Sequence, residues 1–203
     1  MPTAEKYQLS FTTGGLFVAE SVMVAGIYLS NRDWPLTERK LLDDNAFQAR
    51  TASSATRICR EVCSRLKTLD ADELSILLSG SPKEQRQILW IAVCRRYALI
   101  RDFAVHVLRD RYLSLQKTMQ LKDFDSFLHR LTETHEELQT IAESTQKKLR
   151  QVLFRMLKEA ELVDGNTISP VLLSPRIVHV IRAGNPEEIA IFPVFESDVP
   201  GWK

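Results

Sequence analysis

Residues 145–160 have the sequence TQKKLRQVLFRMLKEA, and this stretch decides the fold class. Its apolar residues recur three and four positions apart, the spacing of one face of a helix: Leu149, Val152, Leu153, Met156, Leu157 and Ala160. The other face carries Lys147, Arg150 and Lys158, with Lys148 in the N-terminal half. The stretch therefore predicts a helix with one side in a core and a cationic side available to a ligand.

A second stretch, residues 55–69, repeats this division. Ile58, Val62 and Leu66 follow one another at helical spacing, while Arg57, Arg60 and Lys67 fall on the opposite side. Hydroxyl groups and a further cation lie just upstream, at Arg50, Thr51, Ser53 and Ser54. Since the first turn of a helix exposes backbone N–H groups and the positive end of the helix dipole, this start favours a phosphate.

The segments around residues 145–160 predict a winged helix-turn-helix. Helices are expected over 124–131 and after Thr134, then the helix over 145–160, then a tight hairpin around Asp164-Gly165. Three helices followed by a hairpin is the order of that module, and an extended segment over 189–195 is expected to dock on it.

The strongest helix start in the chain is Ser81-Pro82-Lys83-Glu84, a capping box with Pro at the first helical position. No breaker follows before about Lys117, so one long central helix is predicted. The predicted fold is mainly α: a helical bundle with helix-turn-helix-like parts. We predict an N-terminal helical domain over 1–120 and a C-terminal winged-helix-like module with a docking tail over 121–203.

Composition is that of an ordinary globular protein. Of 203 residues, 44% are hydrophobic and 26% charged, which excludes disordered and fibrous classes. The net charge is only +1, but residues 50–120 hold 13 basic and 7 acidic groups. A polyanion would therefore meet a local basic patch rather than a uniformly basic body.

The cysteines and the apolar runs bear on the compartment. An odd number of cysteines, Cys59, Cys63 and Cys94, argues against a secreted disulfide framework and for the cytoplasm. The most apolar run, 16–29, is shorter than the roughly 20 residues that a membrane span needs, and it contains Glu20. We expect no membrane partner.

No pattern indicates catalysis, a metal site or a cofactor site. The four histidines form no zinc-binding pair, and Gly14-Gly15 lacks the Lys and the preceding strand of a phosphate loop. Cys59 and Cys63 are spaced to share a metal, but no other soft ligand lies near them in sequence, so buried packing is favoured. We therefore expect no catalytic residues, no bound metal and no cofactor.

Three segments together resemble the BrxA family, a component of BREX bacteriophage-defence systems. They are residues 10–15 (SFTTGG), residues 50–61 (RTASSATRICRE) and residues 191–193 (IFP). The resemblance implies a helical DNA-binding protein with helix-turn-helix-like parts that acts in antiviral defence beside other BREX proteins, including a methyltransferase. The family has also been likened to the RNA-binding antitermination factor NusB.

The leading hypothesis is a non-catalytic binder of double-stranded DNA that contacts the phosphate backbone with modest sequence preference. The predicted binding residues lie on the two basic helices: Arg50, Thr51, Ser53, Ser54, Arg57, Arg60, Lys67, Lys147, Lys148 and Arg150. Two alternatives stay open. The basic faces suit acidic surfaces of other defence proteins, and RNA suits a NusB-like factor, although few aromatic residues are predicted at the surface to stack bases.

Overall fold

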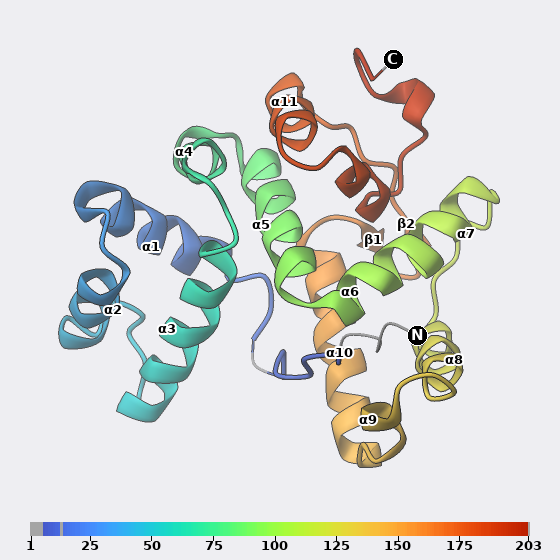
Figure 1. Cartoon of the computed structure of the whole chain (residues 1–203), viewed down its shortest axis with the longest axis horizontal. Coiled ribbons are helices and arrows are strands. Elements are labelled where there is room, and N and C mark those ends of the chain that lie inside the picture. The colour runs from blue at the N-terminus through green and yellow to red at the C-terminus, as the bar shows by residue number, and fades with distance from the viewer. Residues whose placement is uncertain (1–5, 13, 203) are drawn as a thin grey trace. The chain divides into compact units, whose positions relative to one another are not determined.

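The computed structural model describes residues 6–12 and 14–202, which form eleven α-helices and one small sheet (Figure 1). The prediction of a mainly helical bundle is confirmed. Within the described residues, no helix has the length and apolar character that crossing a membrane requires. Thr13, part of the opening SFTTGG segment, lies outside the described residues.

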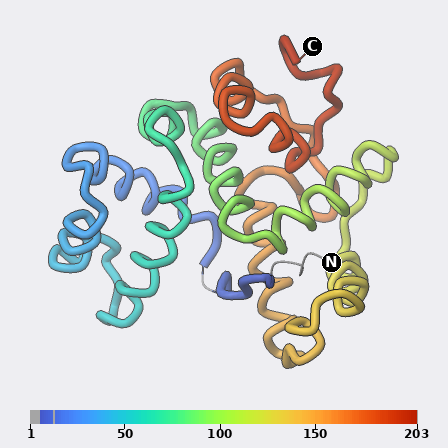
Figure 2. The backbone as a smooth tube through the Cα atoms, viewed as in Figure 1, coloured from blue at the N-terminus to red at the C-terminus, as the bar shows by residue number. Residues whose placement is uncertain are grey.

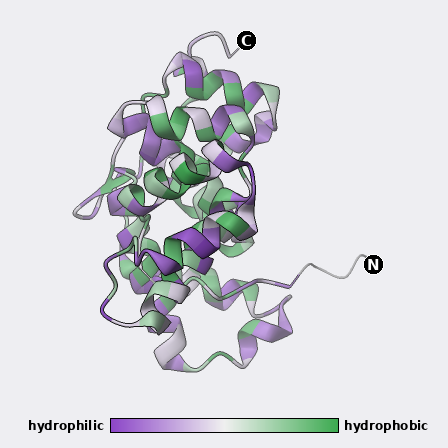
Figure 3. Cartoon of the chain, turned by 90° about the vertical axis from the view of Figure 1, so that its left-hand side faces the viewer, coloured by the Kyte–Doolittle hydropathy of each residue, from purple (hydrophilic) through white to green (hydrophobic). Residues whose placement is uncertain are grey.

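The chain divides into two compact units, which are described separately. One unit comprises 16–96, and the other comprises 1–15 together with 97–203 (Figure 2). These units do not coincide with the ranges 1–120 and 121–203 expected from the sequence. Hydropathy alternates along many helices, as expected when one helix face packs in a core and the other meets solvent (Figure 3).

The 16–96 unit is a bundle of five helices. They are α1 (Val18–Asn31), α2 (Trp34–Asp43), α3 (Ala52–Leu66), α4 (Ala71–Ser79) and α5 (Pro82–Arg96). Helix α1 packs on α2, α3 and α4, while α5 packs on α3 and α4. The predicted capping box starts α5: the Ser81 N–H donates to Glu84 Oε2 at 2.8 Å, and the Glu84 N–H donates to Ser81 Oγ.

Two ion pairs in this unit have a buried carboxylate, and the sequence patterns did not predict them. Arg65 is 1% exposed and its Nη2 lies 2.7 Å from Glu61 Oε1 in the preceding turn of α3. Arg95 of α5 forms a two-pronged pair with Glu73 of α4, with N–O distances of 2.8 and 2.7 Å. Buried charges need such partners because an unpaired charge away from water is costly.

The long helix predicted from Pro82 to about Lys117 is wrong, because the helix ends at Arg96. Tyr97 adopts an extended backbone (φ −127°, ψ 97°) and its side chain is fully buried, with its ring 5.2 Å from that of Phe11. The helix is interrupted where this ring is buried, and no Pro or Gly near Tyr97 in the sequence indicates the interruption. Helix α6 (Ala98–Phe103) follows, then a π-helical turn η1 (Ala104–Arg109) and α7 (Asp110–Leu113).

Helices α6 and α7 belong to the second unit, and the rest of that unit follows the predicted order of elements. It contains α8 (Leu121–Leu131), α9 (Glu136–Gln139), α10 (Glu143–Glu159), strands β1 (Val163–Asp164) and β2 (Thr167–Ile168), α11 (Pro175–Ala183), and the 3₁₀ turns η2 (Pro186–Ile191) and η3 (Glu196–Asp198). The predicted hairpin is confirmed: Val163 pairs with Ile168, and Gly165 has the positive φ of 56° that the turn needs. The expected extended segment over 189–195 is wrong for its first three residues, which belong to η2.

A third segment extends the hairpin. The Ile168 N–H donates to the carbonyl of Lys117, and the Met119 N–H donates to that of Asn166, both at 2.7 Å. Thr118 forms an isolated antiparallel bridge with Thr167. The chain between α7 and α8 therefore lies along β2, on the side away from β1.

The N-terminal segment of this unit is held by Tyr7. The Tyr7 hydroxyl donates to Asp102 Oδ2 at 2.7 Å, its N–H donates to Glu137 Oε1 at 2.9 Å, and its ring lies 4.4 Å from that of His135. Burial tends to raise the pKa of Glu137, but hydrogen bonds from Tyr7, from its own N–H and from His135 outweigh burial, so the pKa lies below its usual range.

Candidate nucleic-acid interface

The first basic surface, which we call the α3 face, comprises Arg50, Thr51, Ser53, Ser54, Arg57 and Arg60, all exposed. Thr51 is the N-cap of α3, and its Oγ1 accepts the N–H of Ser54 at 3.1 Å. The other side of the helix is buried through Ala55, Cys59, Val62, Cys63 and Leu66, whereas Ile58, which the pattern also placed on that side, is half-buried. Core packing therefore fixes which side of α3 meets solvent.

The cations of the α3 face are available to a ligand. Across residues 6–12 and 14–202, no carboxylate forms an ion pair with Arg50, Arg57 or Arg60. The reason is local. Glu61, the only acidic residue from 50 to 67, turns into the core to pair with Arg65.

Lys67 differs from these arginines, although the sequence grouped it with them. Its Nζ lies 2.7 Å from Glu38 Oε1 and 5.5 Å from the centre of the Trp34 ring. That ring is stacked on Tyr28, with 3.9 Å between ring centres. Lys67 therefore ties the end of α3 to α2, and a phosphate would have to compete with Glu38 for it.

The second basic surface lies on α10, and two of its three predicted cations are paired. Lys147 Nζ lies 2.7 Å from Glu143 Oε1 one turn earlier, and Arg150 pairs with Asp125 of α8. The hydrogen bond and the charge of Lys147 lower the pKa of Glu143. In the part of the chain that the structure describes, Lys148 has no such partner.

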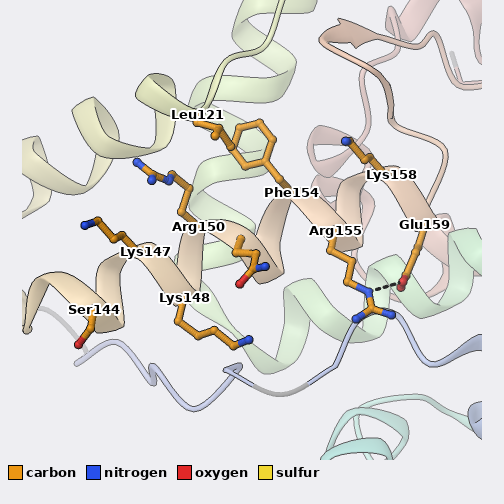
Figure 4. A pocket seen from close by; sticks show the side chains of 10 residues that line it. Leu121, Ser144, Lys147, Lys148, Arg150, Phe154, Arg155, Lys158 and Glu159 are labelled. Atoms are coloured by element: carbon orange, nitrogen blue, oxygen red, sulfur yellow. Dashed lines mark hydrogen bonds and ion pairs between the residues drawn. The ribbon is translucent and has the colours of Figure 1, made fainter.

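The α10 surface is hollowed rather than flat (Figure 4). We call this hollow the α10 groove. It has a volume of about 700 Å³, and its lining comes from α10 and the first residue of α8: Leu121, Ser144, Lys147, Lys148, Arg150, Gln151, Phe154, Arg155, Lys158 and Glu159. The predicted binding residues omitted Arg155 and Lys158, although helical periodicity places Lys158 on the outer face of the helix and Arg155 at the margin of that face.

Phe154 forms the base of the α10 groove. Phe154 lies on the side of α10 that carries the cations, but it is not left open to solvent. It is 8% exposed, its ring lies 6.3 Å from that of Phe103, and Leu121 lies beside it (Figure 4). Leu121 itself is 50% exposed, so an apolar strip remains open between the cations.

The two basic surfaces belong to different units, the α3 face to 16–96 and the α10 groove to the other. Each is therefore a separate candidate site. Neither contains a metal-binding cluster: no three His, Cys, Asp or Glu side chains of the described residues are placed to hold an ion. Cys59 and Cys63 are buried with 4.0 Å between their sulfur atoms, and their mutual hydrogen bond and burial raise the pKa of the Cys63 thiol.

A sequence profile of the BrxA family matches residues 5–185. The chain belongs to the BrxA family. Its relatives include the "BREX protein BrxA" of Escherichia coli O9:H4 (strain HS), which is 25% identical over 182 residues. The alignment covers 88% of this chain and 85% of that protein. The "BREX protein BrxA" of Bacillus cereus (strain H3081.97) is 27% identical over 150 residues, 72% of this chain and 75% of that protein.

BrxA-family membership confirms the resemblance found in the sequence. Among solved structures, an uncharacterized protein from Magnetospirillum magneticum superposes with a TM-score of 0.80 at 21% identity. The superposition covers 93% of this chain and 98% of that one. At this identity the match shows a shared fold alone.

Proposed function

We propose that this BrxA-family chain is a non-catalytic, double-stranded-DNA-binding component of a bacterial BREX phage-defence system that works in the cytoplasm. Two relatives are named as BREX proteins, which supports membership of such a system and other BREX proteins as partners. Three free cysteines suit a reducing compartment.

The observation that carries the DNA proposal is the α3 face. Arg50, Arg57 and Arg60 are exposed and lack carboxylate partners in the described chain; Arg50 lies just before the 15-residue helix α3, and Arg57 and Arg60 lie within it. The helix start adds partly positive N–H groups and the hydroxyls of Ser53 and Ser54. Such groups bind phosphate oxygens without reading bases, so the proposal includes only modest sequence preference.

The remaining predicted contacts belong to the same proposal with smaller expected contributions. Lys67, Lys147 and Arg150 must each exchange a protein carboxylate for a phosphate, so their net gain on binding is reduced. Lys148 has no pair to break among the described residues and is expected to contribute more than its two neighbours on α10.

We include the winged helix-turn-helix in the same proposal, with α8, α9 and α10 as its three helices and β1 and β2 as its hairpin. What supports it is the chain order of three helices followed by a hairpin. In that module the helix before the hairpin enters the major groove, and this helix corresponds to α10. The hairpin here is short, and Asp164 makes its tip acidic, so we expect helices rather than the wing to contact phosphates.

The test is the salt dependence of binding to a labelled DNA duplex, measured by fluorescence anisotropy. Each contact that releases a counterion contributes about 0.9 to the slope of log affinity against log salt. The double variant Arg57→Ala/Arg60→Ala is therefore expected to flatten the slope by about 1.8, which amounts to about a twelvefold smaller loss of affinity between roughly 50 and 200 mM salt.

A matched control removes two exposed cations of the same unit that lie on other helices, Arg39→Ala/Lys83→Ala. It is expected to leave the slope within about 0.5 of wild type, well short of one full contact. Equal effects of the two double variants, or no binding at low salt, would count against the α3 face. Stronger competition by single-stranded RNA than by duplex would favour the NusB-like alternative.

A further inference from the structure

The α10 groove combines two features that phosphate binding alone does not need. Five of its ten lining residues are Lys or Arg and one is Glu, yet its base is the apolar pair Phe154 and Leu121. A phosphate backbone makes use of the cations only. Half of Leu121 is left exposed beside an aromatic ring, and such surface is stabilised when an apolar side chain covers it.

The spacing of these residues defines a ligand pattern. Arg150 precedes Phe154 by one helical turn and Lys158 follows it by one turn, so a cation lies on each side of the apolar base along the helix axis (Figure 4). A helix laid along α10 matches this pattern when it carries an apolar anchor with an acidic residue one turn before and one turn after it. Peptides that bind in helical form use this mode, an amphipathic helix in a groove.

The charge of the groove fits a moderately acidic ligand. Lys147, Arg150 and Arg155 already lie against Glu143, Asp125 and Glu159, respectively, so a ligand carboxylate at Arg150 competes with Asp125. Lys148 and Lys158 have no carboxylate partner in the described chain. A ligand with a few carboxylates and an apolar anchor gains from both features. A densely charged polyanion gains from the cations alone and leaves the apolar base uncovered.

We infer that the α10 groove is a docking site for an acidic, amphipathic helical segment of a partner protein, with Phe154 and Leu121 receiving its apolar anchor. This docking goes beyond the proposed DNA binding and does not depend on it, because the α3 face belongs to the other unit. Where both ligands are present, the segment and DNA compete for Lys148.

The probe is a fluorescein-labelled helical peptide with a central Phe and a Glu one helical turn before and after it. Its binding to the full chain is measured by fluorescence anisotropy. Leu121→Ser is expected to weaken binding about tenfold, since the anchor then loses about half a leucine of apolar contact. Lys158→Glu is expected to weaken it further. Because Leu121 is half exposed, its replacement leaves the core intact, which circular dichroism verifies.

Two controls match these changes. Leu172→Ser alters another exposed leucine, outside the groove, and is expected to leave peptide affinity unchanged. A peptide with Ser in place of the central Phe is expected to bind at least tenfold more weakly. Equal binding of the Phe and Ser peptides, or equal effects of the two leucine variants, would overturn the inference.

Other occupants give different results. If the peptide does not bind but duplex DNA binding falls with both Lys158→Glu and Leu121→Ser, the groove belongs to nucleic acid and the inference is overturned. If sedimentation shows self-association that Leu121→Ser abolishes, the groove belongs to a second copy of the chain, which also overturns it. DNA binding lost in Arg57→Ala/Arg60→Ala with peptide binding retained separates the two proposals.

Discussion

Glu73 ties together three parts of the 16–96 unit, and its replacement by Ala should destabilise that unit strongly. Its carboxylate is 1% exposed and pairs with both terminal nitrogens of Arg95 on α5. The same carboxylate accepts the N–H of Asp70 at 2.9 Å, half of the capping box that starts α4. Arg95 also donates to the carbonyl of Thr68, which holds the chain between α3 and α4.

The expected loss follows from these contacts. Removing one partner of a buried pair costs about 3–5 kcal/mol, because the other charge is left without compensation. Losing a cap interaction adds about 1 kcal/mol. The Arg95 side chain is 22% exposed and regains some hydration, so we take the lower end and expect about 4 kcal/mol. This is a large part of the roughly 5–15 kcal/mol that stabilises a typical domain.

Urea unfolding followed by tryptophan fluorescence measures this loss, since Trp34 and Trp90 lie in the 16–96 unit. Glu73→Gln keeps an acceptor for the Asp70 N–H but removes the charge, so about half of the loss is expected. Arg95→Met, alone and combined with Glu73→Gln, completes a double-mutant cycle. A loss below about 1 kcal/mol for Glu73→Ala would refute the reasoning, because it would mean that the buried pair contributes no more than an exposed one.

Further predictions concern the three thiols, the pH dependence of stability and two glycines. The three thiols, those of Cys59, Cys63 and Cys94, are all buried. None should therefore react rapidly with a disulfide reagent in the native protein, and all three should react after unfolding. One rapidly reacting thiol in the native protein would contradict this. Because the pKa of Glu137 is lowered in the folded protein, the ionised Glu137 carboxylate stabilises the fold at pH values above the ordinary pKa of a glutamate, about 4.3. This contribution to stability is lost as the pH falls through the lowered pKa. Melting temperatures of wild type and Glu137→Gln should therefore differ at pH 7 and converge in acid; a constant difference would oppose this. Gly165→Ala should lower the free energy of unfolding by about 1 kcal/mol, because the φ of Gly165 is positive. Gly26→Ala should raise it by about 0.5–1 kcal/mol, because Gly26 lies within α1 and an added Cβ there meets only Leu78, at 3.7 Å. Chemical denaturation distinguishes the two signs.

Local patterns predicted most of the helices because the rules that produce them are local. A capping box satisfies the first N–H groups of a helix with side chains three residues apart, so Ser81 and Glu84 identify the start of α5. Likewise, Asp164-Gly165 indicated a tight turn, and the hairpin is present there, with Asp164 paired to Thr167. The buried and exposed sides of α3 and α10 followed from helical periodicity for the same reason.

The missed break at Tyr97 has a cause outside its neighbourhood in sequence. Its ring is buried against Phe11, 86 positions earlier in the chain, and no residue near 97 disfavours a helix by itself. Competition between helix continuation and the burial of an aromatic ring is decided by packing. Packing also buries Glu61 and Arg65 as an ion pair, although charged residues usually lie at the surface.

By itself, the sequence determined that the chain is helical, where its amphipathic helices lie and which of their sides carry cations, since each depends on residues within a few turns of one another. Only the tertiary structure decided which cations remain available. Lys67 and Arg150 meet carboxylates 29 and 25 positions away, whereas Arg57 and Arg60 meet none among the described residues. The physical reason is that an ion pair depends on distance in space, and the folded chain alone sets that distance.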